Sequence, residues 1–199
     1  MSTISAAMVK KLREKTGAGI MDCKEALAEC GGDENKAFDF LRTKGLATAA
    51  KRAGRTMSEG IVQSYIHSDS KLGVLVEINC ETDFVAKNDD FKAFAKNIAM
   101  HIAATNPAGI RQEDVPEGTI NKEKEIYRSQ VLEMGKPENI ADKIVEGKLK
   151  KYFKENCLIH QAYVRNPEIT IEDFVNELIA KIGENITIKR FERFKIGES

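Results

Sequence analysis

Apolar residues near the start of the chain recur at the three- and four-residue spacing that is typical of amphipathic helices. Ser5 stands where it can cap a first helix, and Gly17 can end that helix because glycine adopts the left-handed conformation without strain. Asp22 followed by Glu25 matches a capping box, which predicts that a second helix opens there. Asp33, after two glycines, is placed to cap a third. The pattern therefore predicts a compact bundle of three short helices.

The predicted loop between the first two helices carries two apolar residues, Ile20 and Met21. In one interpretation they close the core of the bundle. In the other they stay exposed and bind a partner helix, since methionine adapts to irregular surfaces. The basic, alanine-rich residues 44–55 favour a linker helix. We place a domain boundary after this linker, so that residues 1–55 form the first domain and residues 56–199 the second.

The second domain opens with a strand pattern. Residues 61–67 are rich in β-branched and aromatic side chains, and residues 72–79 alternate between apolar and polar, which predicts a hairpin with one buried face. Further along, the spacing predicts a helix over 91–102, an αα-hairpin over 121–156, a helix over 170–182 and a third strand over 186–196. The simplest assembly is an α+β domain, in which helices pack on a three-stranded antiparallel sheet.

A short polar turn links the second strand to the next helix, and we call its residues Thr82, Asp83, Phe84 and Val85 the corner. Thr82 is suited to cap the helix that follows. The aromatic character of Phe84 alone favours a place in the core. A strand end that presents an acid and an aromatic ring together is also suited to contact a partner, so both interpretations stay open.

The charge balance narrows the class of partner. Lysine and arginine together number 31, aspartate and glutamate also number 31, and the formal net charge is zero. A chain without basic excess is not built as a general nucleic-acid binder, which favours a protein or a small molecule as partner. The N-terminus lacks a signal-peptide pattern, and no apolar run reaches the length of a membrane span. We therefore expect a cytoplasmic protein without a membrane anchor.

Motifs for bond-making chemistry are missing from the sequence. The four cysteines form no C-x-x-C pair, and the three histidines lie far apart without metal-type spacing. The phosphate loop, the dinucleotide fingerprint and the nucleophile elbow do not occur. Spacing alone leaves a Cys–His nucleophile pair open, although no cysteine is marked as activated. We expect reduced thiols that pack as small hydrophobes, no cofactor, and a binding role rather than catalysis.

Two long stretches resemble signatures of the bacterial elongation factor Ts family. Residues 12–27, LREKTGAGIMDCKEAL, are similar to its N-terminal signature, and residues 77–87, EINCETDFVAK, are similar to its second. Both stretches occur in the expected order. The resemblance continues through Gly135-Lys136-Pro137 and residues 182–186 to the last strand, and so covers essentially the whole chain.

The resemblance implies a guanine-nucleotide exchange factor for the GTPase elongation factor Tu, with no cofactor of its own. It also implies that the N-terminal bundle is of the ubiquitin-associated (UBA) type and that the αα-hairpin protrudes. In the family the bundle docks on the GTPase, which here would involve Arg13, Ile20 and Met21. The corner, with Thr82, Asp83, Phe84 and Val85, would intrude beside the site that holds the nucleotide's Mg²⁺ and phosphates.

The chain departs from the long members of the family, which carry the strand–strand–helix unit twice, whereas this chain carries it once. We therefore hypothesise a homodimer in which one GTPase meets both copies. His67 resembles a histidine in the second copy of the long members, so we expect it to make a minor contact. Two other functions stay open: an RNA-associated adaptor using Lys51, Arg52 and Arg55, and a thiol-dependent enzyme using Cys23, Cys80 or Cys157.

Overall fold

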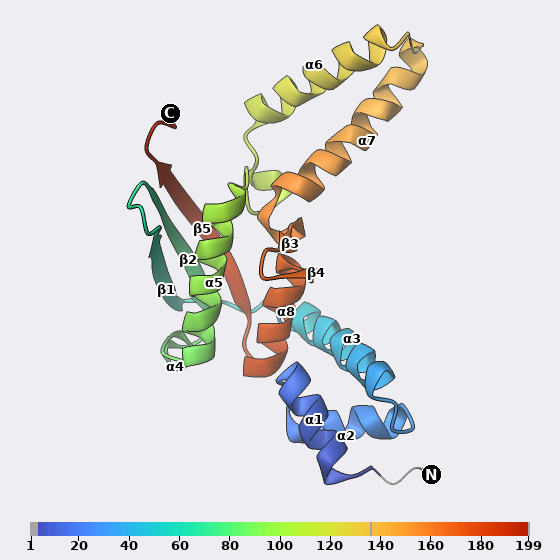
Figure 1. The fold of residues 1–199 in the computed structure, drawn as a ribbon, viewed down its shortest axis with the longest axis vertical. Helices are drawn as coiled ribbons and strands as arrows, with labels where there is room; N and C mark the ends of the chain where they lie inside the picture. The colour runs from blue at the N-terminus through green and yellow to red at the C-terminus, as the bar shows by residue number, and fades with distance from the viewer. Residues whose placement is uncertain (1–3, 136, 199) are drawn as a thin grey trace. The chain divides into compact units, whose positions relative to one another are not determined.

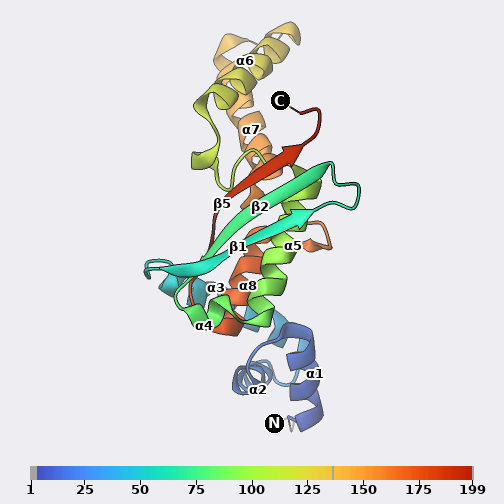
Figure 2. The ribbon, with the colours of Figure 1, turned by 90° about the vertical axis from the view of Figure 1, so that its left-hand side faces the viewer.

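A computed structural model describes residues 4–135 and 137–198, and its fold is α+β as predicted (Figure 1). The sheet has three antiparallel strands in the order β1-β2-β5, which Figure 2 shows side by side. In chain order the elements are α1 (Ala6–Thr16), α2 (Ile20–Glu29), α3 (Glu34–Arg52), β1 (Glu59–Ile66), β2 (Leu72–Cys80), α4 (Asp83–Ala86), α5 (Asp89–Thr105), η1 (Gln112–Asp114), α6 (Glu117–Glu133), α7 (Glu138–Asn156), η2 (Leu158–His160), β3 (Ala162–Tyr163), β4 (Asn166–Thr170), α8 (Ile171–Ile182) and β5 (Ile186–Lys195).

The chain divides into two compact units, each assembled from several segments. The first comprises Met1–Val62, Glu77–Ala95 and Asp173–Thr187, and the second comprises Gln63–Val76, Lys96–Glu172 and Ile188–Ser199. The strands β1, β2 and β5 and the helices α5 and α8 contribute residues to both units. Compactness alone does not test which segments fold independently, so the predicted domains 1–55 and 56–199 stay a prediction.

The caps of α1 and α3 agree with the sequence, whereas the start of α2 does not. The Ser5 side chain accepts a hydrogen bond from the Met8 N–H, and Gly17 ends α1 at φ 68°. The predicted capping box at Asp22 is wrong, because α2 begins at Ile20 with Gly19 as its N-cap. The extended backbone of Gly19 leads into the helix early, and the Asp22 carboxylate pairs with a lysine instead. Ile20 and Met21 therefore lie on a helix rather than in a loop.

The third helix is longer than predicted. The Asp33 side chain accepts hydrogen bonds from the N–H groups of residues 35 and 36, and α3 then runs without a break to Arg52. The expected linker helix is thus the second half of α3, since the alanine-rich segment contains no proline and Gly45 is its one glycine inside the helix. Gly45 lies where α3 meets α8, because a Cβ there would stand 3.3 Å from the Cβ of Ala180. The buried core of the N-terminal helices is formed by Leu12, Cys23, Ala26, Leu27 and Ala37.

The hairpin of β1 and β2 follows the predicted alternation. Every second residue of β2 from Val74 to Cys80 is buried. Gly60 of β1 has φ 154°, and a Cβ there would stand 2.3 Å from the carbonyl oxygen of Ile78. Only glycine allows the two strands to approach this closely. The predicted stripe of α5 is also buried and consists of Phe91, Phe94, Ala95, Ile98 and Ile102.

The helices α6 and α7 form the predicted αα-hairpin within the second unit. Gly135 has φ 69° at its turn, and Lys136 lies outside the described residues. The start of α6 was predicted too late, because the helix already begins after Pro116, a residue that suits the first turn. After α7 the chain forms η2 and the short strand β3, which pairs antiparallel with β4.

Candidate partner-binding site

The corner presents one exposed aromatic ring on a short, capped helix. The hydroxyl oxygen of Thr82 accepts a hydrogen bond from the Val85 N–H at 3.4 Å, so Thr82 caps α4 as predicted. The helix has four residues and buries Val85 and Ala86. Phe84 points away from this buried side and is 81% exposed. The structure thus leaves the ring free to contact a partner, while Val85 offers little accessible surface.

Asp83 places a negative charge beside that ring. Its carboxylate forms an ion pair with Nζ of Lys87 at 2.7 Å, one helical turn later. The hydrogen bond from Lys87 lowers the pKa of Asp83, so the carboxylate is ionised at neutral pH. The Lys87 side chain is largely exposed and the Asp83 side chain is half-exposed. A partner can therefore replace Lys87 as the counter-charge at little cost, because exposed ion pairs contribute little to stability.

The backbone of the corner is held by a residue far away in the sequence. Oε2 of Glu184 accepts hydrogen bonds from the N–H groups of Glu81 at 3.2 Å and Thr82 at 3.0 Å, and Oε1 accepts one from the Thr82 hydroxyl at 2.7 Å. In return, Oε1 of Glu81 accepts from the N–H of Asn185 at 2.7 Å. The sequence did not mark Glu184 or Asn185 as functional. Their one signal was their place in residues 182–186, a segment that shares in the family resemblance.

The other predicted contact residues are exposed but are not all brought together. Ile20 is 56% exposed and Met21 is 73% exposed, and both lie in the first turn of α2. Arg13 is exposed on α1. These residues and the corner belong to the first unit, whereas His67 belongs to the second, where its Nδ1 lies 2.9 Å from the Tyr65 hydroxyl. A role in partner binding stays a prediction for each of them.

The structure gives internal roles to two of the three cations considered for RNA binding. Arg52 donates a hydrogen bond to the Ile179 carbonyl at 3.1 Å, near the C-terminal end of α8. Arg55 lies 3.4 Å from the carboxylate of Glu81. Arg52 is thereby held inside the fold, whereas Arg55 is half-exposed and its ion pair is weak, so the alternative of an RNA adaptor stays untested.

The buried cysteines are poorly suited to act as nucleophiles. Cys23, Cys80 and Cys157 are buried and free of disulfides. Burial raises the pKa of the Cys80 thiol to about 11 and also raises that of Cys157. The Cys80 thiol donates a hydrogen bond to the Thr82 carbonyl at 3.2 Å, so it helps to hold the corner. A thiol that stays protonated at neutral pH is a weak nucleophile.

Residues 4–135 and 137–198 contain neither a metal-binding cluster nor a membrane-spanning helix. No group of three or more histidine, cysteine, aspartate or glutamate residues in this part of the chain could hold a metal ion. Within the same ranges, no helix has the length and apolar character needed to cross a membrane.

Comparison with known proteins identifies the chain. Residues 47–198 match the family model described as Elongation factor TS. Among curated relatives, Elongation factor Ts of Desulfosudis oleivorans is 69% identical over 198 residues, with 100% of both chains covered. The proteins of the same name from Carboxydothermus hydrogenoformans and Caldanaerobacter subterraneus are each 60% identical over 98% of this chain, covering 90% and 98% of the relative.

These matches define the class of the protein, which is that of the translation elongation factors. Within that class, the chain belongs to the elongation factor Ts family. The family model begins inside α3, whereas the relatives also cover the N-terminal helices. The resemblance read from residues 12–27 and 77–87 is thereby confirmed.

Proposed function

We propose that the chain is a guanine-nucleotide exchange factor that binds elongation factor Tu–GDP and promotes GDP release, after which GTP rebinds during translation elongation. One observation supports the proposal beyond family membership. The ring of Phe84 is 81% exposed, and the turn that carries it is fixed by hydrogen bonds from Thr82 to Glu184. An exposed ring on a firmly held turn is suited to enter another protein, because binding then costs little ordering of the ring's own backbone.

The mechanism that we propose is competition with the nucleotide for one conformation of the GTPase. GDP is held largely by a phosphate cradle and a bridging Mg²⁺. A factor that binds the distorted, cation-free site more tightly must weaken nucleotide binding by the same free energy, because coupling between two sites is reciprocal. Phe84 acts as a wedge between packed side chains near this site, and Asp83 competes for its polar contacts. The activity breaks no bond and uses no cofactor.

The N-terminal helices supply the second contact in this proposal. Ile20 and Met21 form an exposed apolar pair at the start of α2, and Arg13 adds a positive charge from α1. Aromatic, methionine and arginine side chains are enriched at the centres of protein interfaces. We assign docking to this contact and nucleotide displacement to the corner. The protein then acts in the cytoplasm, on a protein partner, without direct contact to nucleic acid.

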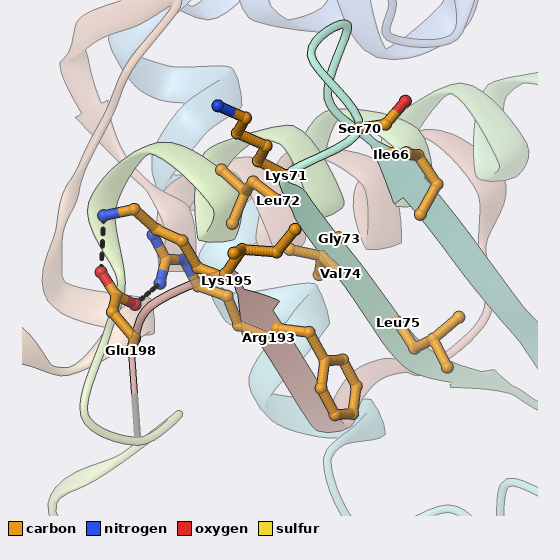
Figure 3. Close-up of a pocket in the computed structure, with 12 residues that line it drawn as sticks. Ile66, Ser70, Lys71, Leu72, Gly73, Val74, Leu75, Arg193, Lys195 and Glu198 are labelled. Carbon is orange, nitrogen blue, oxygen red and sulfur yellow. Dashed lines mark hydrogen bonds and ion pairs between the residues drawn. The ribbon is translucent and has the colours of Figure 1, made fainter.

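We further propose that two copies pair through the outer face of the sheet in the second unit. Ile66, Leu75, Phe194 and Ile196 are exposed apolar residues there, and they border a hollow of about 640 Å³. Figure 3 shows this hollow, with the charged cluster of Arg193, Lys195 and Glu198 at its edge. Exposed apolar patches rimmed by charges are typical of protein interfaces. Because the chain carries one strand–strand–helix unit, pairing would present two copies to the GTPase.

Each proposal has its own test. For exchange, labelled GDP bound to elongation factor Tu is chased with excess unlabelled GDP while the concentration of the chain is raised. We expect the release rate to rise and then saturate, and a rate that does not change would defeat the exchange proposal.

For pairing, sedimentation of the wild type should show a dimer and Phe194→Glu a monomer. A wild type that is monomeric at the concentrations of the exchange assay removes the dimer.

A further inference from the structure

We propose that Glu184 is a positioning residue for the corner: its carboxylate fixes the backbone from which Phe84 projects. The inference rests on the proposed exchange function and deepens it, because it names what makes the wedge rigid. Glu184 need not touch the GTPase for this role. It acts through Thr82 and through the N-terminal end of α4.

The carboxylate accepts hydrogen bonds from donors that lie outside regular secondary structure. Glu81 and Thr82 lie between the last residue of β2 and the first residue of α4. Both backbone N–H groups and the Thr82 hydroxyl converge on Glu184 within 2.7 to 3.2 Å. Hydrogen bonds to an ionised acceptor are the stronger kind, and all three lie in the first unit. The turn is therefore held at three points by one side chain.

The same carboxylate orients the cap of α4. A hydroxyl has one proton to donate and lone pairs that accept. Because the Thr82 hydroxyl gives its proton to Glu184, its lone pairs remain for the Val85 N–H. A helix of four residues has no stability of its own, so it depends on this cap and on the burial of Val85 and Ala86.

Glu184 is itself held in place from both sides. It follows Gly183, which ends α8 at φ 92°, and precedes Asn185, which is 3% exposed. The N–H of Asn185 donates to Glu81, so the two segments exchange hydrogen bonds in both directions. The C-terminal end of α8 is tied to α3 by the hydrogen bond from Arg52 to Ile179. The corner is thus attached to two helices through residues about a hundred positions away in the chain.

Loss of the Glu184 carboxylate should affect nucleotide displacement rather than docking on the GTPase. A wedge displaces packed side chains only if its own backbone does not yield, and misplacement of an acting group by about 1 Å can cost roughly a hundredfold in rate. Removal of the Glu184 carboxylate leaves Val85 and Ala86 buried but removes the hydrogen bonds that fix the backbone of Glu81 and Thr82. The maximal release rate should therefore fall, while the contact made by Ile20 and Met21 is unchanged.

The test compares Glu184→Ala with Glu172→Ala, which removes an exposed glutamate from the first turn of the preceding helix, α8. GDP release from elongation factor Tu is measured as the factor concentration rises. For Glu184→Ala we expect the saturating rate to fall roughly tenfold, with the half-saturating concentration changed less than about twofold. Glu172→Ala should match the wild type in both quantities.

Two further comparisons separate positioning from a general loss of structure. A double variant with Phe84→Ala should be no slower than Phe84→Ala alone, because groups that act through one another are not additive. Thr82→Ser keeps the hydroxyl and should release GDP faster than Thr82→Val, which removes it. If Glu184→Ala does not fold, the two Thr82 variants decide the question, and equal rates for them overturn the inference.

Different results would refute the role of Glu184 and the exchange function. A wild-type chain that does not accelerate release defeats the exchange function itself. A wild type that accelerates release and loses this ability on Phe84→Ala, together with an unimpaired Glu184→Ala, overturns only the role of Glu184. Additive losses in the double variant also overturn it, because Glu184 would then act elsewhere than on the corner.

Discussion

Truncation of Phe84 to alanine should separate stability from exchange. Phe84 is 81% exposed, so about a fifth of its surface is buried. Replacing a fully buried phenylalanine by alanine costs about 3–5 kcal/mol, and a fifth of that is below about 1 kcal/mol. In a chain of 199 residues this lowers the melting temperature by at most about 4 °C. The fold of Phe84→Ala should therefore stay intact under assay conditions.

The expected effect on exchange is much larger. An aromatic anchor at the centre of an interface contributes about 2–4 kcal/mol. Because each 1.4 kcal/mol corresponds to a factor of ten, the loss in kcat/KM for GDP release should be roughly 30- to 700-fold. The assay is the chase of labelled GDP from elongation factor Tu, with melting curves recorded on the same preparations.

Phe91 is the matched control, since it is the next phenylalanine in the chain and is completely buried. Phe91→Ala should cost about 3–5 kcal/mol of stability, several times the loss expected for Phe84→Ala. If Phe84→Ala lowered the melting temperature as much as Phe91→Ala, the ring would belong to the core. If Phe84→Ala left the exchange rate unchanged, the ring would not be the wedge.

Two predictions concern the fold that supports the site. Gly60→Ala should destabilise the protein by more than about 3 kcal/mol in urea unfolding, since its Cβ would stand 2.3 Å from the Ile78 carbonyl oxygen. The control is Gly147→Ala, which lies in open space within α7 and should stabilise the protein by up to about 1 kcal/mol. Equal effects of the two substitutions would contradict the close approach of β1 and β2. Burial lowers the pKa of His101, whose Nδ1 accepts from a backbone N–H and whose Nε2 meets Gln161 at 2.9 Å. The unfolded chain then binds the extra proton, so the contribution of His101 is complete above about pH 6.5 and is lost as pH falls below it. The free energy of unfolding should fall less between pH 7 and pH 5 in His101→Gln than in the wild type, and identical slopes would refute the buried neutral imidazole.

Elements with a long, regular apolar pattern could be predicted from the sequence. The strand β2 and the helices α5 and α8 bury one face each, and the periodicity of their apolar residues records that burial. The cap at Thr82 was also readable, because a cap depends on residues that are close in sequence. Asp22 shows the limit of such local motifs. It fits a capping box, yet Gly19 allows α2 to begin earlier.

The elements and site residues that the sequence did not predict depend on contacts between distant residues. The strands β3 and β4 are too short to show a period, and their pairing is visible only in space. The exposure of Phe84 could not be read from its type, since an aromatic side chain favours the core. Glu184 received no role from the sequence, because its partners lie 102 and 103 positions earlier in the chain. Support of a site by distant hydrogen bonds leaves no local pattern.

The central claim is that the chain binds nucleotide-free elongation factor Tu more tightly than the GDP-bound form. Titration calorimetry can measure the dissociation constant of the chain for both forms, and that of GDP for the GTPase with and without the chain. The account predicts that each ligand weakens the other by the same factor, roughly tenfold to a hundredfold or more. Equal affinities of the chain for the two forms would contradict it, because a ligand without preference cannot shift the equilibrium.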